Sequence, residues 1–386
     1  MPPRSIFPPP STLGILGGGQ LGRMFALEAR RMGFRVAVFT DEAVGSPGGQ
    51  VADIEVNARY EDEKALDAFL ARVDVVTAEF ENIPDSCLRY VEQRKPLRPG
   101  RHAIFTTQHR EREKLFLRDR GIACAEFRIV TDLEELTQAI EELGRPSVIK
   151  TAAFGYDGKG QAKVLPETDL TEVWKAFTGH HAVVEQWVPF VSEVSVVGAR
   201  SVTGQMATFG VVENIHDRHI LDVSIAPARV EESVRTQAEA LWKAVAEGLD
   251  YVGTMAVEMF VKSDGSVIVN EVAPRPHNSG HHTIDACLTN QFQQQVLAVA
   301  GLPLGDPHQH TPAAMVNLLG DVWPAETRNP DWSLVLNHPR AKLHLYGKQL
   351  AKMRRKMGHF TLLADTAEQA LSEARAIQQA LGTRVS

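Results

Sequence analysis

The sequence predicts a protein of mixed α/β and α+β class, with an N-terminal α/β unit, a larger central unit and a small C-terminal unit. Near the N-terminus, short apolar runs alternate with helical patterns, as at residues 12–16 and 36–39. Between residues 182 and 270, several strand-like runs are separated by turn signals, as in an antiparallel sheet. After the Gly- and Pro-rich stretch 301–307 the composition shifts again. We therefore expect units at 1–110, 111–305 (with a smaller lobe at about 120–182) and 306–386.

Composition and charge exclude several classes of protein. The 386 residues can form two or three cores, and 44% are apolar, as in ordinary globular proteins. A formal charge of −7 argues against nucleic acid as a partner, so any anion site must be local. Cys87, Cys124 and Cys287 lie far apart, which fits a reducing compartment and neither a disulfide framework nor a zinc site. With no run near about 18 apolar residues, we expect a soluble cytoplasmic protein without a membrane partner.

A glycine-rich turn follows the first predicted strand. Gly17, Gly19 and Gly22 form a G-x-G-x-x-G pattern in a Rossmann-like βαβ unit, and Asp41 follows at about the distance of a ribose-binding acid. A dinucleotide site is therefore one interpretation. The pattern itself requires only an anion at a helix N-terminus, which a phosphate monoester satisfies equally well. A tight turn needed only for packing is the third interpretation.

Two acids follow the predicted strand near 73–77 in the same unit. Alternation places Glu79 and Glu81 on one side of the chain. The carboxyl edge of a parallel sheet is where open α/β folds bind ligands, and these acids could accept hydrogen bonds from an amino group. Capping of the helix that starts near Pro84 is an alternative role for one of them.

The central unit contains a second glycine-rich loop between two predicted strands. It holds the residues Gly155, Tyr156, Asp157, Gly158, Lys159, Gly160 and Gln161. Backbone amides of such a loop can wrap phosphates, and Lys150 before it would point a positive charge at the same phosphates. An ordinary hairpin loop is the less favoured alternative.

The next strand leaves into an extended segment, Glu185, Gln186, Trp187 and Val188. Such a segment offers backbone N–H and C=O groups to the edge of an adenine. Glu193 follows, where a carboxylate could bind a ribose diol. His216 comes near the same place, although a lone histidine is more often structural.

Two separate acids indicate a metal site on neighbouring strands. Glu258 and Glu271, the latter beside Asn270, suit a hard cation that is also bound to substrate phosphates. Proline residues after Glu271 hold an extended path that presents Arg275 and His277. A solvated edge-strand acid is the alternative for Glu258 alone. The combination indicates an enzyme.

These residues resemble the ATP-grasp superfamily and, within it, the N5-carboxyaminoimidazole ribonucleotide synthetase family, ATP-dependent carboxylases of purine synthesis. The resemblance extends from about Gly14 to His359 and rests on the stretches 17–24, 79–84, 155–161, 270–281 and 346–359. The related formate-dependent glycinamide ribonucleotide transformylase typically has Glu-Leu-Gly-Lys where this chain has Gln-Leu-Gly-Arg at 20–23. That enzyme, as another ATP-grasp carboxylate-amine ligase, is the alternative within the superfamily.

The resemblance implies a pre-ATP-grasp domain, an ATP-grasp fold and a small C-terminal domain that completes the substrate site. It implies ATP as cosubstrate and Mg²⁺, or Mn²⁺ in its place, bound by Glu258 and Glu271. The residues expected to bind ATP are Arg110, Lys114, Lys150, Gly155, Tyr156, Asp157, Gly158, Lys159, Gly160, Gln161, Glu185, Gln186, Trp187, Val188, Glu193, His216, Asn270 and Glu271.

It further implies aminoimidazole ribonucleotide and bicarbonate as substrates, and a homodimer. The residues expected to bind the ribonucleotide are Gly19, Gln20, Leu21, Glu79, Tyr156, Arg275, His277, Lys348, Arg354 and Arg355. The expected catalytic residues are Tyr156, Asp157, Arg275, His277 and Lys348. In the family, bicarbonate attacks the γ-phosphate, and the carboxyphosphate releases CO₂ beside the substrate amine, away from water. The general base stays open among Glu79, Asp157 and His277.

The chain departs from the family pattern in two places. After Lys348 the family commonly has Arg-Pro-Gly, whereas a longer segment intervenes here, so Lys352, Arg354 and Arg355 are all candidates for the substrate phosphate. Outside the expected ATP site, the run 348–356 holds the only concentrated cations, so we expect it to fold back onto the turn 19–21. His282 stands where the family usually has Trp.

Two functions of other classes compete with the carboxylase. A dehydrogenase built on the first glycine-rich turn would leave Lys150, Glu258 and Glu271 without a role. A non-catalytic ATP-binding scaffold would be expected to have lost a metal carboxylate or a phosphate lysine, and the sequence keeps all of them.

Overall fold

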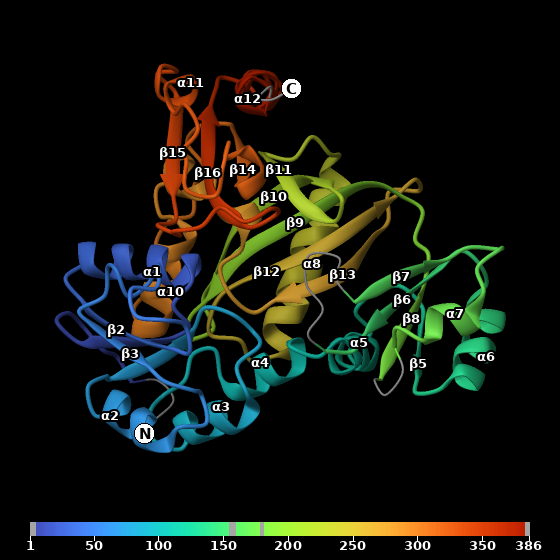
Figure 1. Ribbon diagram of the computed structural model, residues 1–386, viewed down its shortest axis with the longest axis horizontal. Helices are drawn as coiled ribbons and strands as arrows, with labels where there is room; N and C mark the ends of the chain where they lie inside the picture. The colour runs from blue at the N-terminus through green and yellow to red at the C-terminus, as the bar shows by residue number, and fades with distance from the viewer. Residues whose placement is uncertain (1–4, 154–159, 178–180, 383–386) are drawn as a thin grey trace.

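The computed structural model describes residues 5–153, 160–177 and 181–382 and contains three sheets (Figure 1). The N-terminal sheet is parallel, with the order β3-β2-β1-β4. Its strands are β1 (Thr12–Leu16), β2 (Arg35–Thr40), β3 (Ile54–Asn57) and β4 (Val75–Ala78). The helices of this part are α1 (Gln20–Arg31), α2 (Glu63–Leu70), α3 (Asp85–Glu92) and α4 (Arg101–Thr107).

The N-terminal sheet is apolar on both faces, as expected for parallel strands covered on each side. Along β2, Val36 and Val38 face one core and Ala37 and Phe39 face the other. The first core includes α1 and also α10 (Gln291–Ala300), which belongs to the central part of the chain. Helix α10 lies beside α1 in Figure 1, so a distant segment fixes the N-terminal unit to the rest.

The small lobe, at the right of Figure 1, is a four-stranded sheet with the order β5-β8-β6-β7. Its elements are β5 (Phe127–Val130), α6 (Leu133–Leu143), β6 (Ser147–Thr151), β7 (Gln161–Val164), α7 (Leu170–Trp174) and β8 (Ala182–Gln186). Helix α6 begins after Asp132, whose side chain accepts a hydrogen bond from the N–H of Glu135 at 2.8 Å. Helix α5 (Arg110–Asp119) leads into this lobe from the N-terminal unit.

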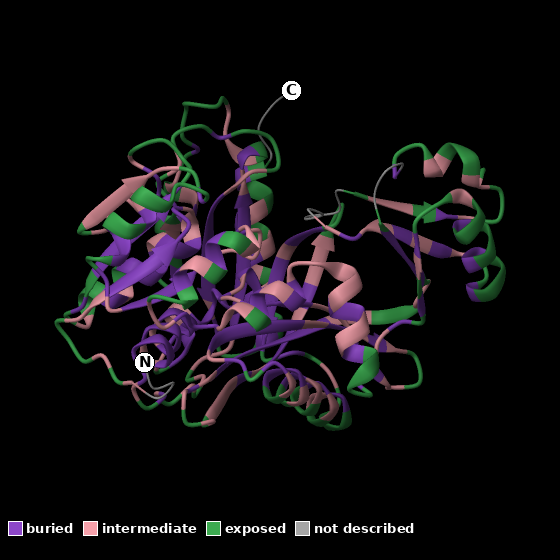
Figure 2. Cartoon of the chain, turned by 90° about the horizontal axis from the view of Figure 1, so that it is seen from below, coloured by how far each residue is buried: buried purple, intermediate pink, exposed green. Residues whose placement is uncertain are grey.

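The largest sheet has eight strands in the order β13-β12-β9-β10-β11-β14-β16-β15, and all neighbouring pairs are antiparallel. Its central-unit strands are β9 (Phe190–Arg200), β10 (Met206–Asp217), β11 (Ile220–Ala226), β12 (Gly253–Lys262) and β13 (Val267–Ala273). Helix α8 (Glu232–Gly248) covers one face and buries Trp242 completely. Figure 2 shows the strands of this sheet largely in purple, whereas exposed residues collect on loops and outer helix faces. The short helices η1 (Asn278–Gly280) and α9 (Thr283–Ala286) follow β13.

The C-terminal strands continue the same sheet. Strand β14 (Ala313–Leu319) pairs with β11, and β16 (Lys356–Leu363) and β15 (Ala341–Leu345) follow. The remaining elements are η2 (Gly320–Val322), α11 (Ser333–Leu336) and α12 (Ala367–Gly382). The division of the chain into units at residues 110 and 305 stays a prediction. Across the described residues, no helix is both long and apolar enough to span a membrane.

Apolar runs in the sequence predict strands over 206–212 and 267–270, and the structure differs from both. Strand β13 continues to Ala273, so Glu271 lies inside a paired strand and not at its end. Strand β10 continues to Asp217 and includes His216. Both strand pairs shift register, between Glu258 and Met259 on β12 and between Ile215 and His216 on β10. Such irregularities re-aim side chains and are common beside active sites.

Candidate active site

A cleft of about 880 Å³ opens where the three parts of the chain meet. Its lining includes Gly19 from the N-terminal unit, Lys150 from the small lobe, Glu258 and Glu271 from the large sheet, and Lys356 from β16. The turn after β1, the end of β6 and strands β12, β13 and β16 therefore position one site. No single part of the chain would form it alone.

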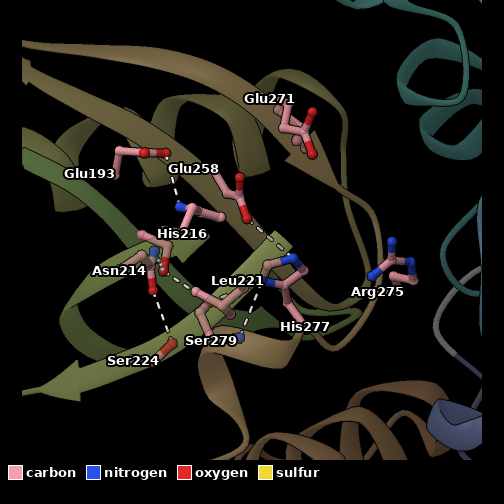
Figure 3. A network of polar contacts seen from close by, with 12 residues as sticks. Glu193, Asn214, His216, Leu221, Ser224, Glu258, Glu271, Arg275, His277 and Ser279 are labelled. Carbon is pink, nitrogen blue, oxygen red and sulfur yellow. Dashed lines mark hydrogen bonds and ion pairs between the residues drawn. The ribbon is translucent and has the colours of Figure 1, made fainter. Parts of the chain in front are cut away.

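The two predicted metal carboxylates are direct neighbours in this cleft. Glu258 on β12 lies opposite Glu271 on β13 in the antiparallel register (Figure 3). Burial and the nearby charge of Glu271 raise the pKa of Glu258 to about 7. A bound cation would remove this repulsion. Among the described residues no group of three or more His, Cys, Asp or Glu could hold a metal, so the two acids fit an ion that also takes oxygens from substrate phosphates.

Three predicted phosphate-binding cations surround the carboxylate of Glu185. Nζ of Lys150 lies 3.0 Å and Nζ of Lys114 3.2 Å from its oxygens, and Nη1 of Arg110 lies 3.9 Å away. Burial alone would raise the pKa of Glu185, but these charges lower it to about 2. Burial lowers the pKa of Lys150 to about 8. The side chain of Glu185 is thus the counterion of the cation cluster, a role that the sequence did not indicate.

The segment after β8 leaves one backbone donor available. The N–H of Gln186 donates to the carbonyl of Glu126 at 2.8 Å, and that of Trp187 donates to Pro146 at 3.3 Å. Within the described ranges, the N–H of Val188 has no protein acceptor. A free N–H beside the cleft is what an adenine edge requires.

Beside this segment the cleft has an apolar wall that the sequence did not single out. The rings of Phe190 and Phe260 stack with centroids 4.6 Å apart and an interplanar angle of 9°. Phe260 pairs with Glu193 across β12 and β9, and the carboxylate of Glu193 lies 3.1 Å from Nδ1 of His216. Burial would lower the pKa of His216, but the hydrogen bond to Glu193 and the charge of Glu258 raise it. His216 therefore belongs to the site.

The first glycine-rich turn holds a carboxylate of the protein itself. The N–H groups of Gly19 and Gly22 both donate to Glu79, the latter at 2.6 Å. A Cβ on Gly19 would come within 2.7 Å of Oε1 of Glu79, and one on Gly17 would overlap its side chain. The glycines thus make room for Glu79. The N–H groups of Gly19 and Gly22 are therefore not available to an external anion, so the dinucleotide interpretation is wrong, and a phosphate monoester would have to be bound by other groups.

Arg275 is joined to the N-terminal unit by a two-pronged ion pair. Its Nε and Nη2 donate to Glu81 at 2.6 and 3.0 Å. Burial would lower the pKa of Arg275, but the charge of Glu81 raises it well above its ordinary value. The plane of the guanidinium is therefore fixed at the cleft wall. The sequence had suggested Glu81 as a ligand contact and had not paired it with Arg275.

His277 lies next to the predicted metal carboxylate Glu258. Its Nε2 is 3.2 Å from Oε1 of Glu258. Figure 3 marks this contact with a dashed line. Burial and the nearby charge of Arg275 hold the pKa of His277 well below its usual value, so the ring is neutral.

The C-terminal basic run meets the N-terminal unit. Nε2 of Gln50 donates to the carbonyl of Gly347 at 3.0 Å. Nζ of Lys348 donates to the carbonyl of Lys356 at 2.8 Å, and burial lowers the pKa of Lys348 to about 8. The charge of Lys348 acts on Glu79 in the turn. Lys348 does not line the cleft, so its charge reaches the turn only through its effect on Glu79.

Other members of this run point elsewhere. Nη2 of Arg354 donates to the carbonyl of Arg218 at 2.7 Å, and Nη1 of Arg355 donates to Leu350 at 3.0 Å. Neither arginine lines the cleft, whereas Lys356, which we had not selected, does. The signal for Lys356 was present in the sequence, since it ends the same basic run.

The remaining predicted residues belong to the second glycine-rich loop or to the lining of the cleft. Gly155, Tyr156, Asp157, Gly158 and Lys159 lie outside the described residues. The carbonyl of Gly160 accepts a hydrogen bond from the N–H of Thr151 at 2.7 Å, and Gln161 lines the cleft. Gln20, Leu21, Asp41 and Asn270 also line it.

Three family models match consecutive parts of the chain. They are the ribonucleotide synthetase preATP-grasp domain at residues 11–108, the ATP-grasp domain at 115–292 and the phosphoribosylaminoimidazole carboxylase C-terminal domain at 313–373. The N5-carboxyaminoimidazole ribonucleotide synthase of Bacillus subtilis is 42% identical over 370 residues, which cover 96% of each chain. The chain belongs to the N5-carboxyaminoimidazole ribonucleotide synthase family.

Solved structures of this synthase family agree with that assignment. An ADP complex of an N5-carboxyaminoimidazole ribonucleotide synthetase superposes with a TM-score of 0.90 at 46% identity, covering 97% of this chain and 98% of the other. The Aspergillus clavatus synthase in complex with ADP and 5-aminoimidazole ribonucleotide gives a TM-score of 0.87 at 31% identity, covering 96% and 98%.

His282, which the resemblance marked as an unusual residue at its position, lies in the core. His282 is fully buried, and its Nδ1 lies 2.9 Å from the carbonyl oxygen of Ser279. Burial lowers its pKa to about 4, so the ring is neutral and serves as a packing residue. His282 is not among the residues that line the cleft.

Proposed function

We propose that this chain catalyses the ATP-dependent carboxylation of 5-aminoimidazole ribonucleotide to N5-carboxyaminoimidazole ribonucleotide, with bicarbonate as the carbon source and carboxyphosphate as the intermediate. The names of its relatives support the overall reaction. The single observation that carries the proposal is the opposed pair Glu258 and Glu271 beside the cations around Glu185. This arrangement provides both charges that a phosphoryl transfer from ATP requires.

The nucleotide end of the proposed site contains the cation cluster and the free N–H of Val188. Lys114, Lys150 and Arg110 would exchange part of their interaction with Glu185 for the phosphates of ATP. Glu258 and Glu271 would hold Mg²⁺, or Mn²⁺, on those phosphates. When bound, the ion neutralises charge on the oxygens of the transferred phosphoryl group.

The ribonucleotide end is the turn 19–21 with the C-terminal cations. Lys348 and Lys356 would bind the phosphate monoester, because the turn's own N–H groups of Gly19 and Gly22 are used by Glu79. Arg275 and His277 would orient the reacting groups between the two ends. Burial raises the pKa of Glu79, despite its two N–H donors, which suits a carboxylate that takes a proton from the substrate amine.

Further properties of the family remain part of this proposal. We infer a cytoplasmic homodimer that binds no nucleic acid and no membrane. The alternative of a formate-dependent transformylase is disfavoured by the C-terminal match, and a non-catalytic scaffold is disfavoured by the retained carboxylates and cations.

Measurement of ADP release with purified protein and MgATP tests the proposal. We expect release to require both aminoimidazole ribonucleotide and bicarbonate, and Glu271→Gln to abolish it while thermal stability changes little. Formate with glycinamide ribonucleotide serves as the alternative substrate pair. ADP release that needs this second pair, or near-normal release by Glu271→Gln, would contradict the proposal.

A further inference from the structure

His277 ends a hydrogen-bond chain that runs from the cleft into the large sheet (Figure 3). Its Nδ1 lies 3.0 Å from Oγ of Ser279 and 3.3 Å from the backbone nitrogen of the same residue. A backbone N–H can only donate a hydrogen bond, so Nδ1 must present a lone pair to it. In a neutral imidazole, the ring hydrogen then lies on Nε2.

Three side chains on adjacent strands continue this chain away from His277. Oγ of Ser195 donates to Oγ of Ser279 at 2.8 Å. Nδ2 of Asn214 donates to Ser195 at 2.9 Å, and Oγ of Ser224 donates to Oδ1 of Asn214 at 3.0 Å. All four side chains are buried. We refer to Ser224, Asn214, Ser195 and Ser279 as the serine–asparagine chain.

The serine–asparagine chain has one direction. Because Ser195 gives its hydroxyl hydrogen to Ser279, the hydrogen of Ser279 is left to donate to Nδ1 of His277. Placing the ring hydrogen on Nδ1 would point it at the backbone N–H of Ser279 and would turn the hydroxyl hydrogen of Ser279 away from the ring. Hydrogen bonds in such a buried series reinforce one another, so the arrangement in which Nδ1 accepts is favoured.

The opposite side of the ring faces the metal carboxylates. Nε2 lies 3.2 Å from Oε1 of Glu258, which is itself paired with Glu271. A ring hydrogen on Nε2 is therefore directed at Glu258 and fixes the orientation of that carboxylate. The other ring nitrogen, Nδ1, faces Ser279 and not the cleft, so the ring has no nitrogen on the cleft side that could accept a proton.

We propose that the serine–asparagine chain holds His277 in its Nε2–H tautomer, so that the ring acts as a fixed hydrogen-bond donor to Glu258 and not as the general base. Its members are positioning residues that act through His277. The link to catalysis rests on the proposed function, whereas the tautomer itself does not. The base is then sought between Glu79 and Asp157, of which only Glu79 is described.

The tautomer can be read directly from the protein without metal or nucleotide. Nitrogen-15 NMR of histidine-labelled protein distinguishes a protonated ring nitrogen from an acceptor, and the signals of His277 are assigned by their loss in His277→Asn. We expect a protonated Nε2 and an Nδ1 that accepts a hydrogen bond. A protonated Nδ1 in the wild-type protein would overturn the proposal.

Ser195→Ala tests the role of the serine–asparagine chain, because Ser195 bonds Ser279 and Asn214 and not His277 itself. Without Ser195, the hydroxyl of Ser279 loses the donor that orients it, so only the backbone N–H of Ser279 still favours an accepting Nδ1. We therefore expect the two ring nitrogen signals to move toward each other, as in a tautomer mixture. We also expect kcat to fall about tenfold, as when an outer partner of a metal-site ligand is lost, while the KM for ATP changes less than about twofold.

Ser201→Ala is the matched control. Ser201 is also buried, lies in the turn between β9 and β10, and uses its hydroxyl oxygen to accept hydrogen bonds from the N–H groups of Thr203 and Gln205. The Ser201→Ala protein should be less stable than the wild type, and its His277 signals should be unchanged. Unchanged signals in Ser195→Ala, or equal changes in Ser201→Ala, would overturn the proposal. If wild-type protein shows the expected tautomer but no substrate-dependent ADP release, the proposed function fails and the tautomer assignment stands.

Discussion

Two predicted anion sites of the cleft are each occupied by a buried glutamate of the protein itself. Glu79 accepts hydrogen bonds from the backbone N–H groups of Gly19 and Gly22 in the turn after β1. Glu185 lies among Lys114, Lys150 and Arg110 in the small lobe. A glutamate carboxylate is thus stabilised by neutral backbone dipoles in the turn and by full positive charges in the small lobe.

The pKa values follow this difference. Burial raises the pKa of Glu79, and its two N–H donors do not fully offset that effect. Burial also opposes ionisation of Glu185, but the three cations lower its pKa to about 2. The cation cluster therefore carries positive charge in excess of its own carboxylate, which phosphates of ATP can use. The turn carries no such excess, which is why the proposed phosphate site there includes Lys348 and Lys356.

The largest expected effect is that of Glu185→Gln, which removes the carboxylate paired with Lys114 and Lys150 and one of the two carboxylates near Arg110. We expect the free energy of unfolding to fall by roughly 3–5 kcal/mol, as when one partner of a buried ion pair is removed. MgADP should restore more stability in this variant than in the wild type, because its phosphates replace the lost charge. Urea denaturation with and without MgADP measures both effects.

The control for this prediction is Glu142→Gln, whose carboxylate pairs with Arg128 at the surface and should change stability little. The pH dependence gives a second check. The folded-state pKa of Glu185 is depressed, so its contribution to stability is complete above about pH 4.5 and is lost as the pH falls toward 2. A stability of Glu185→Gln equal to that of the wild type at neutral pH would show that the cluster does not depend on this charge.

The next effect separates the two sites kinetically. Lys150→Met should raise the KM for ATP about ten- to a hundredfold and leave the KM for aminoimidazole ribonucleotide nearly unchanged, because it removes a charge-assisted contact worth roughly 1.5–3 kcal/mol. Lys348→Met should do the reverse. Initial rates at varied concentrations of each substrate measure both constants. Equal changes in both KM values for either variant would mean that the two anion sites are not independent.

A smaller effect is expected for Glu79→Gln, because only neutral N–H groups lose an acceptor. We expect a loss of roughly 1 kcal/mol in the free energy of unfolding. Since the folded-state pKa of Glu79 is raised, the wild type loses stability as the pH rises above about 4.5, and the variant lacks this loss. The difference between the two proteins should therefore change with pH in the sense opposite to that for Glu185→Gln. Parallel pH profiles for the two substitutions would remove the distinction between the regions.

The smallest effect is expected for Asp41→Ala. Asp41 lines the cleft near the turn, but a ribose-binding role belongs to the dinucleotide interpretation that the position of Glu79 excludes. Both KM values should stay within about twofold of the wild type and stability within about 0.5 kcal/mol. A tenfold rise in either KM would show that Asp41 binds a substrate after all.

Much of the fold and part of the site could be predicted because the signals are local. Strand and helix periodicity gave the parallel βαβ unit and the antiparallel run around the turn at Thr203. The acids Glu258 and Glu271 could be placed on neighbouring strands, since one turn signal separates them. The cation Lys150 could be assigned to phosphates from its position before the second glycine-rich loop, whereas Lys114 followed only from the family resemblance.

Other features depend on contacts between residues far apart in the chain, for which a single sequence has no signal. The carboxylate of Glu79 reaches a turn some sixty residues earlier, at Gly19. Arg275 is held by Glu81 across 194 positions. The register shift at Glu258 and the continuation of β13 beyond Glu271 depend on pairing within a sheet of eight strands.

The amino-acid sequence was sufficient to determine the family, the chemical types at the site and the order of its parts, because periodicity, glycine positions and isolated charges are local properties. Three-dimensional packing decided which of those charges meet. It made Glu185 a counterion, filled the first glycine-rich turn with Glu79 and brought Lys356 to the cleft in place of Arg355. The physical reason is that a buried charge must find a partner, and the partner is whichever group the assembled strands and helices bring within a few ångströms.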